Sequence, residues 1–123
     1  MKDILIVGLG GFFGSISRYG IGVYSSKLIL SQFPIGTITV NLVGSLLIGL
    51  LAGYFIKNQA SQALSLLLIT GFCGGFTTFS TFSLDNMKLI KEGFYLQFAL
   101  YGIGSVIIGL VLCMLGILLT SKS

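Results

Sequence analysis

The chain has 123 residues, of which 54% are hydrophobic and 8% are charged, and its formal net charge is +4. A soluble domain carries about a quarter charged residues, so this chain has too few to cover a water-exposed surface. The composition excludes a soluble enzyme and a disordered tail. It also excludes a nucleic-acid-binding protein, because the basic residues are scattered singly rather than gathered on one face.

Long uncharged runs divide the chain into four predicted membrane spans. A membrane-spanning helix needs about 20 mostly apolar residues. The expected fold is therefore an all-α membrane protein, with one four-helix transmembrane domain covering residues 1–123. The expected helices are at about 4–25, 34–56, 62–91 and 95–119.

The first predicted span contains Arg18, the only cation in the first, second and fourth predicted spans. An ionisable group within the membrane is a functional candidate by default. The competing interpretation is that the side chain extends to the membrane interface, because Arg18 lies near the end of its span. The pattern by itself leaves both interpretations open.

The second and fourth spans have small residues at every fourth position, which lets helix backbones approach closely in lipid. Ser45, Gly49 and Gly53 form one such series, and Ser105 lies in the other. This spacing is compatible with specific dimer contacts and with ordinary packing inside one chain. Asn41 is the only amide in the interior of the second span.

The third span is interrupted by residues that weaken an α-helix. Its segment 71–83 contains three glycines and five hydroxyl residues. A helix broken at bilayer depth persists only where it is buried in protein or lines a cavity. We therefore expect ion coordination by the freed backbone groups, and the alternative is a glycine-rich kink without a ligand.

Phe79 and Phe82 are three residues apart, so they can share one helix face, and Ser80 and Thr81 lie between them. An aromatic ring has a positive edge that favours an anion where water is excluded. Hydroxyl groups can donate hydrogen bonds to the same anion. Plain aromatic packing is the alternative for this pair.

The carboxylates lie outside the middle of the spans, and the chain has no histidine. Asp85 and Glu92 come late in the third span or just after it. A proton-coupled exporter of cationic drugs needs a central acid, and a cation channel uses a ring of carboxylates. The runner-up hypothesis, a small multidrug-resistance-type coupled exporter, is therefore disfavoured. A non-transporting membrane subunit is a third hypothesis.

The lysines give no preferred orientation in the membrane. Cationic residues in short loops set topology. One side of a four-span protein would carry Lys2, Lys57 and Lys122, and the other would carry Lys27, Lys88 and Lys91. This tie is compatible with chance and with dual topology, in which both orientations are made and pair antiparallel.

Three motifs make the sequence resemble the Fluc fluoride channel family, also called CrcB. GGFFGSISRY at 10–19 is similar to its first-helix motif, and GTITVNLVG at 36–44 is similar to its second-helix motif. GFCGGFTTFSTF at 71–82 is similar to its long third-helix motif. The resemblance covers almost the whole chain.

The resemblance implies an antiparallel, dual-topology homodimer in the bacterial plasma membrane, with membrane lipid around it. Such a dimer conducts fluoride passively out of the cytoplasm through two pores, is not an enzyme and binds no nucleic acid. The resemblance also implies a structural Na⁺ at the dimer centre, held by the backbone carbonyls of Gly74 and Thr77.

By the same resemblance, Arg18 lies by a vestibule of the pore. The resemblance also assigns pore positions to Tyr101 and Ser105, although no family motif surrounds these two residues. The implied pore residues are Asn41, Phe79, Ser80, Thr81, Phe82, Tyr101 and Ser105.

Overall fold

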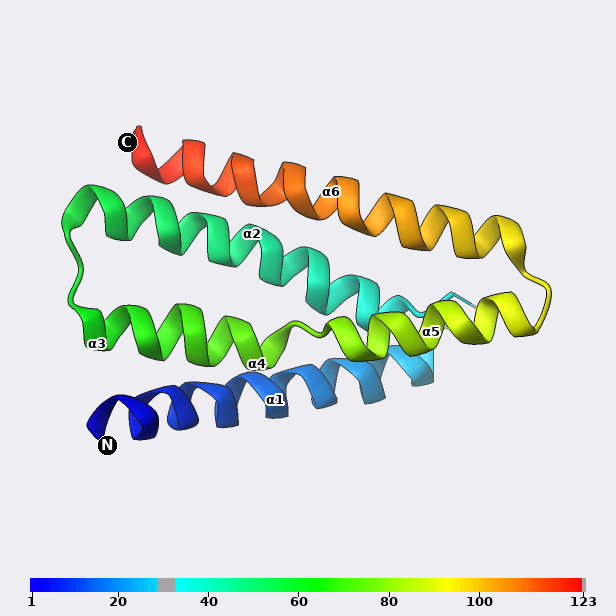
Figure 1. The fold of residues 1–123 in the computed structure, drawn as a ribbon, viewed down its shortest axis with the longest axis horizontal. Coiled ribbons are helices and arrows are strands. Elements are labelled where there is room, and N and C mark those ends of the chain that lie inside the picture. Colours follow the sequence, from blue (N-terminus) through cyan, green and yellow to red (C-terminus); the bar gives the residue numbers. More distant parts are fainter. Residues whose placement is uncertain (29–32, 123) are drawn as a thin grey trace.

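The computed structural model describes residues 1–28 and 33–122. Four long helical segments lie side by side and alternate in direction along the chain (Figure 1). Each is long and apolar enough to cross a membrane, which confirms an all-α protein with four candidate spans. The segments are α1 at Lys2–Leu28, α2 at Ile35–Asn58, a third at Gln62–Lys91, and α6 at Tyr95–Ser121.

The third segment leaves helical geometry at Thr77 and Thr78. Thr77 has φ −88° and ψ 160°, and Thr78 has φ −151° and ψ 125°, so both are extended. The glycines that were expected to weaken the helix remain helical, with Gly74 at φ −62° and ψ −38°. The parts of this segment are α3 at Gln62–Ser65, the π-helical η1 at Leu66–Cys73, α4 at Gly74–Phe76, and α5 at Phe79–Lys91.

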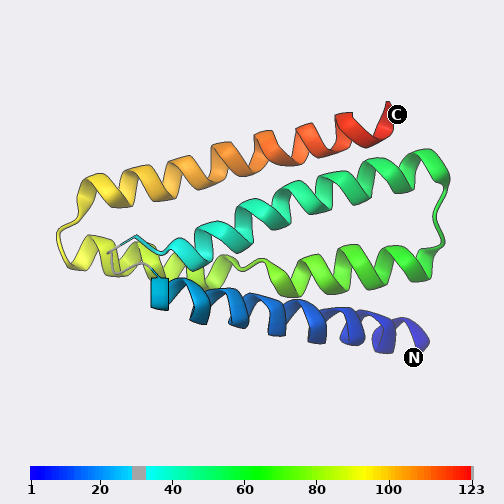
Figure 2. The same cartoon turned by 180° about the vertical axis from the view of Figure 1, so that it is seen from behind.

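Glycines are needed where backbones approach closely. A Cβ added at Gly14 of α1 would meet the carbonyl oxygen of Phe72 and come within 2.9 Å of the Phe76 nitrogen. A Cβ at Gly116 of α6 would come within 2.6 Å of the Leu50 nitrogen in α2. Small residues allow such packing between membrane helices. Accordingly, α1 packs along η1 and α4, and α2 packs along α6. Both views of the ribbon show these pairs side by side (Figures 1 and 2).

The turn after α5 places α6 beside it. Gly93 has φ 82°, a left-handed conformation that glycine adopts without steric cost. The chain reverses there, and α6 begins at Tyr95. This reversal brings the first half of α6, including Tyr101, against α5.

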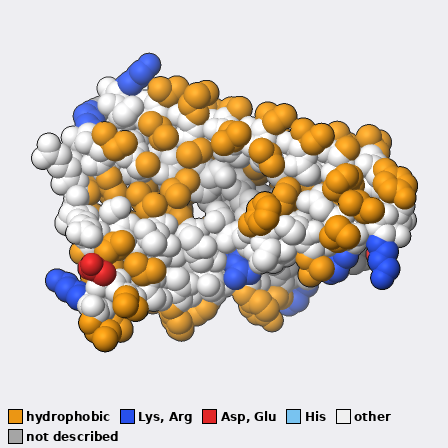
Figure 3. Space-filling model, viewed as in Figure 1, with side chains coloured by type: hydrophobic (Ala, Val, Ile, Leu, Met, Phe, Trp, Pro, Cys, Tyr) orange, Lys and Arg blue, Asp and Glu red, His pale blue; other side chains and the backbone are white. Residues whose placement is uncertain are grey.

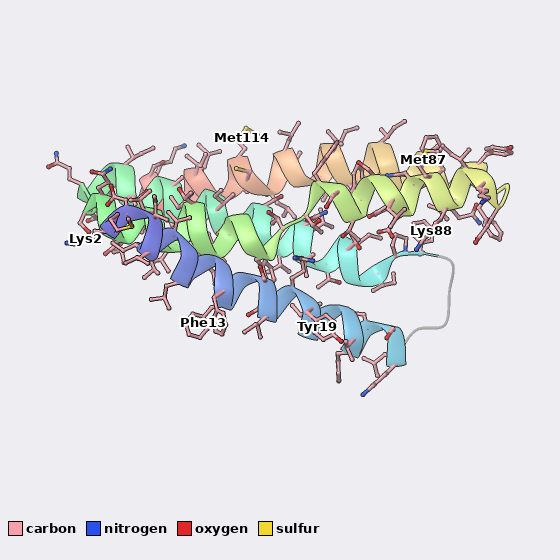
Figure 4. The ribbon with its side chains drawn as sticks, turned by 60° about the horizontal axis from the view of Figure 1, so that its bottom comes forward. Lys2, Phe13, Tyr19, Met87, Lys88 and Met114 are labelled. Atoms are coloured by element: carbon pink, nitrogen blue, oxygen red, sulfur yellow. The ribbon has the colours of Figure 1, made fainter. Side chains whose placement is uncertain are left out.

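Much of the apolar surface faces outward. Apolar side chains are spread over the face shown in Figure 3, and basic side chains lie at its two ends and along its lower edge. Figure 4 shows Phe13 and Tyr19 directed away from the other helices, with Met87 and Met114 on the outside of α5 and α6. The buried apolar side chains among the described residues are Val40, Cys73, Phe76, Leu89 and Tyr101. Lipid or a second chain must therefore cover most of the apolar surface.

Candidate functional site

A larger and a smaller cavity adjoin the interruption of the third segment, and the larger has a volume of ≈ 460 Å³. Its walls come from α2, η1, α4, the extended residues, α5 and α6. The lining is uncharged and combines hydroxyl, amide and aromatic groups. The sequence-predicted residues that line it are Asn41, Gly74, Thr77, Phe79, Phe82 and Ser105.

A second cavity of ≈ 290 Å³ lies on the side of α1. It contains the predicted residues Arg18 and Thr81, and Thr37 of α2 also lines it. Thr78 lines both cavities, so the interruption forms part of the wall between them. The structure therefore divides the predicted site residues between two neighbouring spaces.

Asn41 is bonded to the backbone of Thr78 through both ends of its carboxamide. Its Nδ2 donates to the Thr78 carbonyl oxygen at 3.0 Å, and its Oδ1 accepts from the Thr78 N–H at 2.8 Å. The side chain that was predicted to line a pore thus bonds the backbone of the interruption. Ser45 donates to the Asn41 carbonyl oxygen at 2.7 Å, one turn further along α2.

Arg18 turns into the bundle. Its Nε donates to the carbonyl oxygen of Gly75 at 3.0 Å, and the side chain is half-buried. Its guanidinium group therefore contacts the third segment. The same residue lines the smaller cavity and brings a positive charge to it.

The interruption directs away from the carbonyls of Gly74 and Thr77 the N–H groups that would bond them in a continuous helix. In a continuous helix these oxygens would accept from the N–H groups of Thr78 and Thr81. The Thr78 N–H instead donates to Asn41, and the Thr81 N–H donates to the Thr78 hydroxyl at 3.2 Å. Backbone carbonyls released from a helix are suitable ligands for Na⁺. The donor set therefore fits the predicted cation.

Phe79, Phe82 and Tyr101 form a row of rings. The Phe79 and Phe82 centroids are 5.9 Å apart, and the Phe82 and Tyr101 centroids are 4.9 Å apart. Phe79 is 78% exposed, whereas Tyr101 is 2% exposed and donates to the Asp85 carboxylate at 3.2 Å. Only one end of the row is therefore enclosed by this chain.

The predicted hydroxyl groups lie around these rings. The Ser80 side chain is exposed, and its Oγ is 3.4 Å from Thr78 Oγ1. Thr81 faces the smaller cavity and Ser105 faces the larger one. The structure thus places hydroxyl groups on both sides of α5.

Sequence reasoning missed the roles of Thr78, Ser45 and Asp85. Thr78 caps α5 and also bonds Asn41. The position of this threonine just before Phe79 was a sequence signal for the cap. Asp85 lies one turn after Phe82, which places it near the same helix face. No sequence pattern pointed to its bond with Tyr101, because the two residues are 16 positions apart in different helices.

Comparison with known proteins agrees with this architecture. The family model described as CrcB-like protein, Camphor Resistance (CrcB), matches residues 5–117. A protein of Azobacteroides pseudotrichonymphae named fluoride-specific ion channel FluC is 40% identical over 121 residues, covering 98% of this chain and 97% of the relative. The fluoride-specific ion channel FluC 1 of Nitrobacter hamburgensis is 46% identical, covering 93% and 91% of the two chains. That of Gloeothece citriformis is 45% identical, covering 99% of each.

Four helices long and apolar enough to cross a membrane define a multi-pass integral membrane protein, and its relatives place it in the bacterial cell membrane. The chain belongs to the CrcB family, as its three motifs predicted. The relatives named here are channels, so the hypothesis of a multidrug-resistance-type exporter has no support from them.

Proposed function

We propose that this protein is a fluoride-selective ion channel, which conducts fluoride passively out of the cytoplasm and so lowers its toxicity. The observation that carries the proposal is the uncharged cavity at the interruption, lined by hydroxyl groups and by the rings of Phe79 and Phe82. The names of the relatives agree with this substrate. Passive conduction needs no catalytic group, so the protein is not an enzyme.

The chemistry of the cavity suits a small anion. Fluoride is strongly hydrated, and a pore that strips its water must offer several replacement donors at once. Ser105 supplies a hydroxyl donor in the larger cavity, Thr81 supplies one in the smaller cavity, and Ser80 supplies one at the exposed start of α5. The ring edges of Phe79 and Phe82 carry partial positive charge. Arg18 raises the local concentration of anions at the entrance.

The working unit of the proposal is an antiparallel homodimer with two pores. Phe79 is 78% exposed in the single chain, although it belongs to the cavity wall. A second copy would supply the missing wall and cover this ring. The equal numbers of lysines at the two ends of the helices favour pairing in opposite orientations. The third helix would then be broken near the bilayer midplane.

A structural Na⁺ at the dimer centre is part of the same proposal. The carbonyl oxygens of Gly74 and Thr77 from both subunits would hold it, because their helical N–H partners are bonded elsewhere. When bound, this ion would add positive potential near the pores and fasten the two subunits.

Fluoride efflux from liposomes tests the channel function. Vesicles loaded with potassium fluoride and containing the purified protein should release fluoride when valinomycin carries potassium out. Vesicles loaded with potassium chloride should release far less anion under the same conditions. A lack of fluoride release, or equal release of chloride, would contradict the proposal. A requirement for a proton gradient would instead favour the coupled exporter.

A further inference from the structure

The interruption at Thr77 and Thr78 gives up backbone bonds that a continuous helix would make. The hydrocarbon region of a bilayer has no water to replace them. We propose that Asn41 and Arg18 are positioning residues that supply replacement partners and hold the interruption open, and we call this pair the Asn41–Arg18 clamp. Only the test that measures fluoride flux rests on the proposed channel function. The structural tests of the clamp do not depend on it.

Asn41 supports the interruption from α2. A carboxamide has the same kind of donor and acceptor as a peptide group, so it can pair with one residue as a neighbouring β-strand does. The Asn41 side chain makes both bonds to Thr78, at 3.0 and 2.8 Å, and the dihedral angles of Thr78 are those of a β-strand. Asn41 therefore satisfies Thr78 in the extended conformation.

Arg18 supports the interruption from α1. Its Nε bonds the Gly75 carbonyl, and a bond from a charged donor is stronger than one between neutral groups. A Cβ at Gly75 would come within 2.8 Å of the Gly11 carbonyl oxygen, so this position requires glycine for α1 to approach. Arg18 holds the chain just before Thr77, and Asn41 holds it just after.

The clamp has a consequence for the whole third segment. If Thr77 and Thr78 became helical, their carbonyl and N–H groups would return to the helical ladder, and the carbonyls of Gly74 and Thr77 would be occupied. Two residues would shorten from about 3.3 Å to about 1.5 Å of rise each, which moves α5 along its axis by roughly 4 Å. Phe79 and Phe82 would then leave their present positions at the cavity.

NMR of the protein in detergent micelles tests the Asn41 half of the clamp. Asn41→Leu keeps the size of the side chain and removes both hydrogen bonds. The Cα shifts of Thr77 and Thr78 should move toward helical values, or the Thr78 amide should exchange with solvent at least about tenfold faster. Either change supports the clamp. Unchanged shifts together with unchanged exchange would overturn it.

Asn58→Leu is the matched control on the same helix. Its Nδ2 bonds only the Tyr54 carbonyl one turn away, at 2.9 Å, and its side chain is exposed. This variant should leave the signals of Thr77 and Thr78 unchanged. A change of the same size in the control would show that loss of any asparagine in α2 disturbs the segment, which would overturn the specific role of Asn41.

Two variants of Arg18 test the other half, including the case in which Asn41→Leu does not fold. Arg18→Gln has an N–H donor at the same number of bonds from Cα as Nε, without the charge. The side chain in Arg18→Met is similar in length to that in Arg18→Gln and has no hydrogen-bond donor. We expect Gln to keep the carbonyl shift of Gly75 and to retain at least about tenfold more fluoride flux than Met.

These outcomes separate the clamp from the proposed function. If Arg18 acts only through its charge, the Gln and Met variants will lose flux equally and the Gly75 shift will change equally in both, which would overturn the proposal. If the wild-type protein conducts no fluoride, the channel function fails. The NMR measurements on Thr78 and Gly75 would still decide whether the clamp exists.

Discussion

At the scale of single residues, the described residues that line the larger cavity include no carboxylate. The larger cavity contains an amide, hydroxyl groups and two phenylalanine rings. Asp85 is close by, but its carboxylate accepts a bond from Tyr101 behind the ring of Phe82. The Asp85 carboxylate thus accepts from a hydroxyl donor, and the polar groups that line the cavity are uncharged.

The ring of Phe82 is expected to contribute to conduction through its edge. Phe82→Ile keeps an apolar side chain of substantial volume but removes the positive ring edge. We expect fluoride efflux from liposomes to fall about tenfold, which corresponds to ~1.4 kcal/mol. The measurement is the initial efflux rate at equal protein density.

Phe55→Ile is the control for this prediction. Phe55 lies near the C-terminal end of α2, does not line the larger cavity, and has its ring against Tyr54. Its flux should match that of the unmodified protein. If Phe82→Ile also retains full flux, the ring edge has no role in conduction, and the row of rings serves only for packing.

At the scale of secondary structure, threonines determine the interruption more directly than glycines do. The Thr77 hydroxyl donates to the Cys73 carbonyl oxygen at 2.9 Å, which closes α4. The Thr78 hydroxyl accepts from the Thr81 N–H, which begins α5. Hydroxyl side chains compete with the backbone for such bonds, so they favour helix ends over helix interiors. Gly71 and Gly75 instead serve the close contact with α1, whereas a Cβ at Gly74 would meet nothing within 4 Å.

Loss of the Thr78 cap should destabilise α5. Thr78→Val has nearly the same shape but no acceptor for the Thr81 N–H, and loss of an N-cap costs about 1 kcal/mol. We expect a lower unfolding temperature in detergent and reduced fluoride flux, because the start of α5 carries Phe79 and Phe82.

Ser61→Ala provides a matched comparison. The Ser61 hydroxyl caps α3 by accepting from the Leu64 N–H at 3.2 Å, far along the chain from the cavity residues of α5. It should lose a similar amount of stability and keep its flux. Equal flux in both variants would mean that the cap at Thr78 contributes stability alone.

At the scale of the whole molecule, the two ends of the helical bundle are electrically alike. Lys2 and Lys57 lie at one end by the order of the helices, and Lys27 and Lys88 lie at the other. Cationic residues near span ends orient a membrane protein, and here they are balanced. The open side of the larger cavity and the exposed Phe79 add a surface that a second chain can cover.

Dual topology predicts two orientations in one membrane. Two C-terminal fusions test this, one with a reporter that is active only in the cytoplasm and one with a reporter that is active only outside it. Both fusions should give signal. Addition of two lysines after Lys57 should shift the population toward one orientation. Signal from one reporter alone in the unmodified chain would contradict dual topology and the antiparallel dimer.

Much of the site follows from local sequence, but its connections do not. Asn41 stood out as a lone amide in an apolar span, and Phe79 with Phe82 stood out by spacing. That Asn41 bonds Thr78 was not predictable, because the residues are 37 positions apart and the register between α2 and the third segment is a property of packing. The same reason applies to Arg18 and Gly75, which are 57 positions apart.

The sequence by itself determined the class of this protein, its four spans and its family. These follow from the number and placement of charges and from contiguous motifs, since the cost of a charge in lipid acts on each span separately. Only the tertiary structure decided where the third segment departs from a helix and which side chains hold it there. A backbone group bonds either within its own helix or to a side chain of another helix. Which of these hydrogen bonds forms depends on the side chains that packing brings within reach of that group.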